Sequence, residues 1–247
     1  MKLRHLARCV CLSPLVSIIA THAAVSVTTG AGYIPMAKAI VQVCKKTVNA
    51  PISESYGGHI GQQLMQIHQG NGVNVIITDR GTLESLKSPV ALGATLSLGR
   101  TPLVLIWRKG LEIKSPEDLV RNEVTRIAAP DAKAAVYGRA AKAWLSHQNA
   151  SLQTALGPKW LEVGHVPQVA AYVSRGEVDA GFVNMLASQK NQAQLGGSLP
   201  ITEGYPPIEM IAVAVKSEEN QPDVKAFLSC LQTPETRAVL TRFGIEP

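Results

Sequence analysis

The chain alternates between two hydrophobic periodicities. Short stretches rich in aliphatic and β-branched residues are separated by segments in which apolar residues recur at the spacing of one helix face. The short stretches predict strands at 24–28, 51–56, 73–78, 103–107, 126–129, 161–163, 180–183 and 209–215. The longer segments predict helices at 34–46, 60–69, 134–147, 167–175, 222–231 and 234–243, and a further helix that starts at 115–118.

The order of these elements favours an α/β fold with a parallel sheet. Strands and helices alternate, and the strand at 73–78 is mostly apolar, as expected where helices cover both faces of a sheet. No segment rich in Gly or Ser separates two autonomous halves. If the chain forms two lobes, it must therefore pass between them within strands.

The first 24 residues have the pattern of an export signal. Three basic residues precede position 9, an apolar run extends from 9 to 21, and small residues follow at 23 and 24. The apolar run is shorter than the about 20 residues that span a bilayer. We therefore expect residues 1–24 to be a signal peptide and the mature protein to be periplasmic. A buried first helix and an uncleaved anchor are the alternatives.

Composition and charge exclude several classes of function. A chain of 247 residues with 46% apolar and 17% charged residues is globular, with one large domain or two smaller ones. Its 3 Trp, 5 Tyr and 3 Phe are too few for a stacked-sugar cleft or a single-strand nucleic-acid platform. The signal segment holds three of the 24 basic residues and none of the 18 acidic ones. The mature net charge is then +3 without a basic stripe, so we expect no nucleic-acid partner.

Motifs of catalysis and of metal binding are missing from the sequence. It contains no G-x-S-x-G, H-E-x-x-H or P-loop pattern, and the pair Gly30 and Gly32 lacks the third glycine of a dinucleotide fingerprint. The four histidines of the mature chain lie in separate segments, and no Cys/His set has zinc-ligand spacing. We therefore expect no enzymatic activity, no cofactor and no site for a free cation.

Two cysteines, Cys44 and Cys230, remain after signal removal. In an oxidising compartment they could form one disulfide. Alternatively, each is a small buried apolar side chain on an amphipathic helix. The sequence does not place the two Cα atoms within bridging distance, so both interpretations stay open.

Small-residue loops between a strand and a helix occur three times, at 28–32, 57–61 and 130–135. Each such loop directs backbone N–H groups and the positive end of a helix dipole toward one place, which favours an anion. In parallel sheets, ligands gather at these carboxyl ends of strands. Ordinary turn chemistry explains any single loop, but three loops in a chain without catalytic motifs favour a binding protein.

The segment Tyr137-Gly-Arg-Ala-Ala141 lies near the start of the helix predicted at 134–147. It resembles a helix start of the periplasmic molybdate-binding proteins, the solute-binding subunits of ATP-binding-cassette importers. The similarity continues at 66–78, 166–183, 205–209, 225–228 and 242–244, in the family's order and across nearly the whole mature chain.

This resemblance implies two α/β lobes with mostly parallel sheets, joined by two hinge crossings and closing around a tetrahedral oxyanion. The crossings would fall near 99–101 and 205–209. Lobe 1 would then comprise residues 25–100 and 208–247, and lobe 2 residues 101–207. The family binds its dianion with uncharged hydroxyls and backbone N–H groups, which agrees with the three loops.

The sequence departs from the family at the positions that would touch the ligand. Thr28-Thr29-Gly30 and Gly58-His59-Ile60 stand where the family usually has Ser, and Asn184 stands where some members have Tyr. Thr hydroxyls, the Asn amide and a neutral His ring can still donate hydrogen bonds. We expect the ligand-binding residues to be Thr28, Thr29, Gly58, His59, Ala135, Tyr137 and Asn184, although the Tyr137 ring could simply pack.

The resulting hypothesis is an exported, monomeric protein that captures molybdate or tungstate for the membrane permease of an importer. One alternative is the same fold binding sulfate, thiosulfate, a phosphonate or a small carboxylate. Another is a partner-binding or sensory protein that has lost oxyanion binding.

Overall fold

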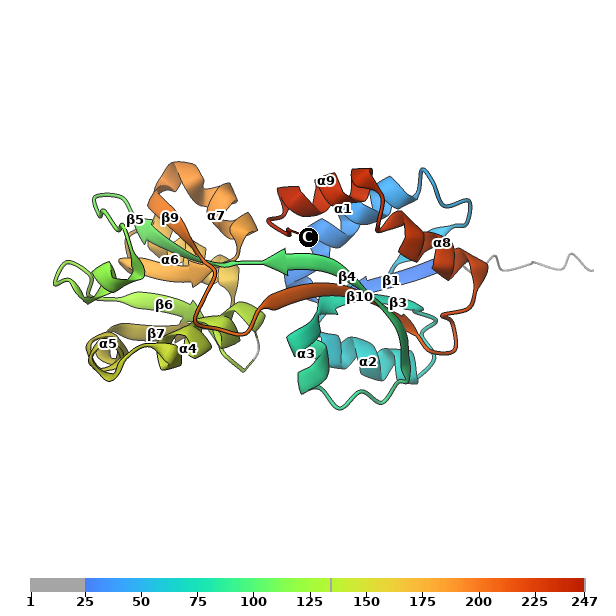
Figure 1. The fold of residues 1–247 in the computed structure, drawn as a ribbon, viewed down its shortest axis with the longest axis horizontal. Coiled ribbons are helices and arrows are strands. Elements are labelled where there is room, and N and C mark those ends of the chain that lie inside the picture. The colour runs from blue at the N-terminus through green and yellow to red at the C-terminus, as the bar shows by residue number, and fades with distance from the viewer. Residues whose placement is uncertain (1–24, 134, 247) are drawn as a thin grey trace, which may run out of the picture.

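The computed structural model describes residues 25–133 and 135–246, so the predicted signal peptide at 1–24 lies outside the described residues. Within them the chain builds two lobes, each on its own five-stranded sheet (Figure 1). We call the part that contains the first sheet lobe 1 and the part that contains the second sheet lobe 2. No helix in the described part of the chain is long and apolar enough to cross a membrane.

Lobe 1 is formed by both ends of the described chain. Its sheet has the order β2-β1-β3-β10-β4. The strands are β1 (Val25–Thr29), β2 (Ile52–Glu54), β3 (Val75–Asp79), β4 (Leu92–Thr101) and β10 (Ile208–Val215). The helices are η1 (Ala31–Tyr33), α1 (Ile34–Cys44), α2 (Ile60–His68), α3 (Arg80–Ser85), α8 (Pro222–Cys230) and α9 (Pro234–Arg242).

Lobe 2 is formed by the middle of the chain. Its sheet has the order β7-β6-β8-β5-β9. The strands are β5 (Leu103–Arg108), β6 (Ile127–Pro130), β7 (Trp160–Val163), β8 (Ala180–Val183) and β9 (Leu195–Ile201). The helices are η2 (Pro116–Val120), α4 (Val136–His147), α5 (Ala150–Leu156), η3 (Gly157–Lys159), α6 (Val166–Ser174), α7 (Met185–Asn191) and η4 (Gln192–Gln194).

The chain passes between the lobes twice, from β4 into β5 and from β9 into β10 (Figure 1). A hydrogen bond joins the two passages. The hydroxyl of Tyr205, in the second passage, accepts it from the N–H of Leu103, which follows the first passage, at 2.7 Å. The residue limits of the lobes predicted from the sequence, 25–100 with 208–247 and 101–207, stay a prediction. The strand pairing puts β4 and β10 in one sheet and β5 and β9 in the other.

The two-lobed α/β fold is confirmed, but both sheets are mixed rather than mostly parallel as predicted. In lobe 1, β1 pairs in parallel with β2 and β3, while β10 pairs antiparallel with β3 and β4. Lobe 2 repeats this arrangement, with β6 parallel to β7 and β8, and β5 antiparallel to β8 and β9. β4 and β10 are antiparallel to each other, as are β5 and β9, because one passage leaves lobe 1 and the other returns to it.

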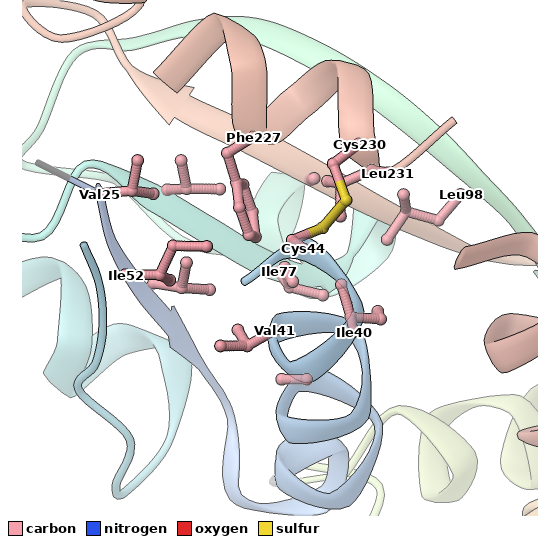
Figure 2. Packing of buried hydrophobic residues seen from close by; sticks show 14 of the residues in the cluster. Val25, Ile40, Val41, Cys44, Ile52, Ile77, Leu98, Phe227, Cys230 and Leu231 are labelled. Atoms are coloured by element: carbon pink, nitrogen blue, oxygen red, sulfur yellow. A yellow bond between two sulfur atoms is a disulfide. The ribbon is translucent and has the colours of Figure 1, made fainter. Parts of the chain in front are cut away.

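In the core of lobe 1, α1 and α8 pack against the sheet, and a disulfide lies inside this core (Figure 2). Cys44 ends α1 and Cys230 ends α8, and their sulfurs are bonded with the Cα atoms 5.8 Å apart. Val41 and Phe227 are fully buried beside this bond. Of the two interpretations of the cysteines, the structure therefore contains the disulfide, which joins the start of the described chain to its end.

Some elements differ from the sequence prediction. The segment expected to start a helix at 115–118 forms only the short 3-10 turn η2. The strand β9 was not predicted because the pair Gly196-Gly197 is typical of a loop that ends an element. In the sheet these glycines lie against the Trp107 side chain of β5, and a Cβ on Gly197 would come within 2.3 Å of the indole ring. The glycines are thus required by packing, and the strand continues through them.

Candidate functional site

The loops that follow parallel strands gather on the sides of the lobes that face each other. In lobe 1, β1 leads to η1, β2 to α2 and β3 to α3. In lobe 2, β6 and β8 run in parallel with Ala128 opposite Gly181, so the loops that lead to α4 and α7 leave the same edge of the sheet. Tyr33 of η1 packs against the hydrophobic cores of both lobes, which shows that these strand ends meet between them.

The first predicted loop holds Thr28 and Thr29 at the end of β1, both fully buried. The Thr28 hydroxyl lies 2.5 Å from the Ser55 carbonyl oxygen and 2.8 Å from Gln63 Oε1. The Thr29 hydroxyl donates to the Ile77 carbonyl oxygen at 2.7 Å. Adjacent strand residues point to opposite faces of a sheet, which explains the different partners. In this structure both hydroxyls therefore bind the protein's own acceptors.

The second predicted loop contains Gly58 and His59 before α2. Gly58 has φ +63°, a left-handed conformation that favours glycine, and its carbonyl accepts from Ala31 N–H at 3.2 Å. This bond joins the first and second loops. His59 forms a capping box in which its Nδ1 accepts from Gln62 N–H at 3.4 Å and its own N–H donates to Gln62 Oε1 at 3.3 Å.

A pocket of about 640 Å³ lies beside this second loop. Gly58 and His59 form part of its wall, and the side chains of Gln62, Met65 and Gln66 from α2 form another part. The Gly58 N–H has no acceptor among the described residues. The second loop thus presents an open backbone donor at the start of a helix, which is the kind of group that favours an anion.

The predicted residues of lobe 2 lie at the starts of α4 and α7. Ala135 N–H donates to the Asp131 carbonyl at 2.9 Å, inside its own loop. Tyr137 is buried, with its hydroxyl 3.5 Å from Thr101 Oγ1, and burial raises the pKa of this phenol well above its usual range. Asn184 caps α7, because its Oδ1 accepts from Ala187 N–H at 2.8 Å.

The structure thus separates the predicted donors into two groups. Five are engaged within the protein: the hydroxyls of Thr28, Thr29 and Tyr137 and the N–H groups of His59 and Ala135. Two have no acceptor among the described residues: the Gly58 N–H and the side-chain amide Nδ2 of Asn184. The roles of all seven as ligand contacts stay predictions.

Three residues between the lobes were not selected from the sequence. Asp79 ends β3 and is 2% exposed, Tyr33 donates to its Oδ2 at 3.4 Å, and Arg139 approaches it from α4. Burial, Tyr137 and Asp79 together raise the pKa of Tyr33 well above its usual range. A carboxylate directly after an apolar strand was a usable signal, because ionised side chains are rarely buried without a partner.

Metal chemistry gains no support from the side-chain arrangement. Across residues 25–133 and 135–246, no three His, Cys, Asp or Glu side chains come together in a group that could hold a metal ion.

Known proteins show the same architecture. The curated molybdate-binding protein ModA of Azotobacter vinelandii is 26% identical over 237 residues, covering 93% of this chain and 92% of its own. The ModA of Rhodobacter capsulatus is 25% identical over 193 residues, covering 76% of this chain and 74% of its own. The solved structure of the periplasmic molybdate-binding protein of Azotobacter vinelandii superposes with a TM-score of 0.70 at 25% identity, covering 90% and 99% of the two chains.

A family model settles the class of protein. Residues 25–246 match the model described as "Bacterial extracellular solute-binding protein", which spans both lobes. A non-enzymatic family agrees with the absence of catalytic motifs from the sequence. The chain therefore belongs to the bacterial extracellular solute-binding protein family, and it is a binding protein rather than an enzyme.

Proposed function

We propose that the protein captures a small tetrahedral oxyanion, molybdate or tungstate first, between its lobes in the periplasm and delivers it to the permease of an ATP-binding-cassette importer. The observation that carries this proposal is that loops at the strand ends of both lobes meet between the lobes. The family match over residues 25–246, which covers both lobes, supports it. Two relatives described as molybdate-binding, at 25% and 26% identity, favour molybdate within the wider class of anions.

The two open donors would make the first contacts. Gly58 N–H belongs to lobe 1 and the Asn184 amide to lobe 2, so an anion held by both would require the lobes to be closed. Each lies at a helix start, where the dipole favours negative charge. Thr28, Thr29, His59, Ala135 and Tyr137 would shape the loops around these donors or change partners when the ligand arrives. Such a shell is uncharged and discriminates by geometry.

A different anion is the second candidate. It is favoured by the engagement of Thr28 and Thr29, because both hydroxyls that would replace the family's Ser donors already bind Ser55 and Ile77 carbonyls. A site with fewer hydroxyl donors would suit sulfate, thiosulfate, a phosphonate or a small carboxylate.

A thermal-shift panel on the mature protein separates these candidates. A ligand at 100 times its dissociation constant stabilises the folded state by about 2.7 kcal/mol, which raises the melting temperature measurably. Molybdate and tungstate should raise it while sulfate leaves it unchanged. A response to carboxylates or phosphonates alone would support the second candidate. If no anion changes the melting temperature, the protein does not bind oxyanions, and a partner-binding or sensory role remains.

A further inference from the structure

A polar cluster joins the two lobes at the start of α3. The Asp79 side chain is 3% exposed, and its Oδ1 accepts from Thr82 N–H at 2.7 Å. Tyr33 donates to the other carboxylate oxygen. Both partners belong to lobe 1, so they hold the carboxylate in place whatever lobe 2 does.

Arg139 reaches this cluster from lobe 2. Its Nη2 donates to Thr82 Oγ1 and lies 3.6 Å from Asp79 Oδ1. The helices α3 and α4 that carry these groups lie on facing sides of the lobes (Figure 1). Among the ion pairs of the described residues, this is the only one that crosses between the lobes.

Separation of the lobes would break these contacts together with the packing of Tyr33 against the core of lobe 2. Asp79 would keep Thr82 N–H and Tyr33 but lose its countercharge, and Thr82 Oγ1 would lose its donor. With the lobes together the carboxylate is buried and needs a countercharge, which Arg139 supplies at 3.6 Å. The contact energy is therefore present only when the lobes are together, and it shifts the equilibrium between open and closed forms.

We propose that Arg139 is a latch residue: through Thr82 and Asp79 it holds the lobes closed before any ligand binds. The latch goes beyond the proposed function, since it needs no ligand to operate. If only the closed form binds the ligand, the observed affinity is the affinity of the closed form multiplied by the fraction of molecules that are closed. Arg139 thus sets the strength of binding for every ligand between the lobes alike, and it does not choose among them.

Small-angle X-ray scattering of the ligand-free protein tests the latch directly. The variant Arg139→Gln should have a larger radius of gyration than the wild type. Raising the salt from about 0.05 M to about 0.5 M should expand the wild type toward this value and leave the variant unchanged, because salt screens a partly exposed pair. Equal radii of wild type and variant at both salt concentrations would overturn the proposal.

The matched control is Arg175→Gln. Arg175 pairs with Glu177 at 2.6 Å within lobe 2, so its loss removes one surface ion pair without touching lobe 1. This variant should keep the wild-type radius. Thr82→Val provides a second route to the same result, because it removes the hydroxyl acceptor and keeps the backbone N–H that holds Asp79. Should Arg139→Gln unfold, an unchanged radius in Thr82→Val together with no expansion of the wild type at high salt would contradict the latch.

Binding measurements complete the test. Arg139→Gln should weaken the binding of every anion that binds the wild type by the same factor, about three- to tenfold, because the lost contact joins a one-third exposed Arg139 to a buried Asp79. A loss confined to one anion would make Arg139 a ligand contact and refute the latch. If no anion binds the wild type, the proposed function fails, while the scattering comparison still decides the latch.

Discussion

Replacing Asn184 by Asp separates ligand binding from helix capping at one residue. In the structure Asn184 Oδ1 caps α7 by accepting from Ala187 N–H at 2.8 Å, which turns the Nδ2 amide away from the helix. An aspartate is an equally good cap, and its charge at a helix start contributes a further 0.3–1 kcal/mol of stability, to order of magnitude. The variant should therefore melt at the wild-type temperature or slightly above it.

The same replacement should abolish tight anion binding. A hydrogen bond to a charged ligand contributes about 1.5–3 kcal/mol, so losing the amide donor costs about tenfold or more in affinity. Repulsion between the new carboxylate and an anion about 4 Å away adds up to about 4 kcal/mol per unit charge at an effective dielectric constant of about 20. Titration calorimetry with the anion that stabilises the wild type measures the loss.

A matched control exists in the same lobe. Asn149 caps α5 with the same geometry, its Oδ1 accepting from Leu152 N–H at 2.9 Å, and α5 follows α4 rather than a strand. Asn149→Asp should give the same small gain in stability and leave the anion affinity unchanged. If Asn184→Asp binds the anion as tightly as this control, Asn184 is a helix cap only and the predicted ligand shell is wrong in lobe 2.

Three further changes test the scaffold. Partial burial opposes ionisation of Asp179, but Arg108 and the backbone and hydroxyl donors around it lower its pKa to about 2. Asp179→Asn should therefore lower the free energy of unfolding in urea at pH 7 by about 2 kcal/mol. This difference should disappear as the pH falls from about 4 to 2. Reducing the Cys44–Cys230 bond, which spans 186 residues, should lower the unfolding free energy by about 2–4 kcal/mol, and an unchanged midpoint would show that it does not constrain the unfolded chain. Gly197→Ala should destabilise by about 1–3 kcal/mol through its clash with the Trp107 ring, whereas Gly157→Ala, with no atom within 4 Å of the added Cβ, should not.

Most of the strands and helices were predictable because their signals are local. The strand at 180–183 has the predicted limits, and the helices at 34–44 and 60–68 differ from the prediction by one or two residues at one end. Each of these elements has apolar residues at its own period. The long strand β4 was missed because it lies at a sheet edge and carries many half-exposed residues, so its pattern is weak.

The site was harder to predict because it depends on which donors are already used. A sequence shows that the Thr29 hydroxyl can donate a hydrogen bond. The Ile77 carbonyl that accepts this bond lies 48 residues away on a neighbouring strand. Likewise, the use of His59 N–H by Gln62 becomes visible only once the capping box has formed. The cluster of Arg139 and Asp79 joins residues of two lobes, which no local pattern reports.

Calorimetric titration of the mature, ligand-free protein with molybdate tests the central claim most directly. The account predicts saturable binding of one molybdate per chain, weakened uniformly with other anions in Arg139→Gln and lost in Asn184→Asp. Saturable binding of a different small anion would keep the site and change its ligand. The absence of any heat with molybdate, tungstate, sulfate, phosphonate or carboxylate, from protein shown to be folded, would contradict the claim that this chain captures an anion between its lobes.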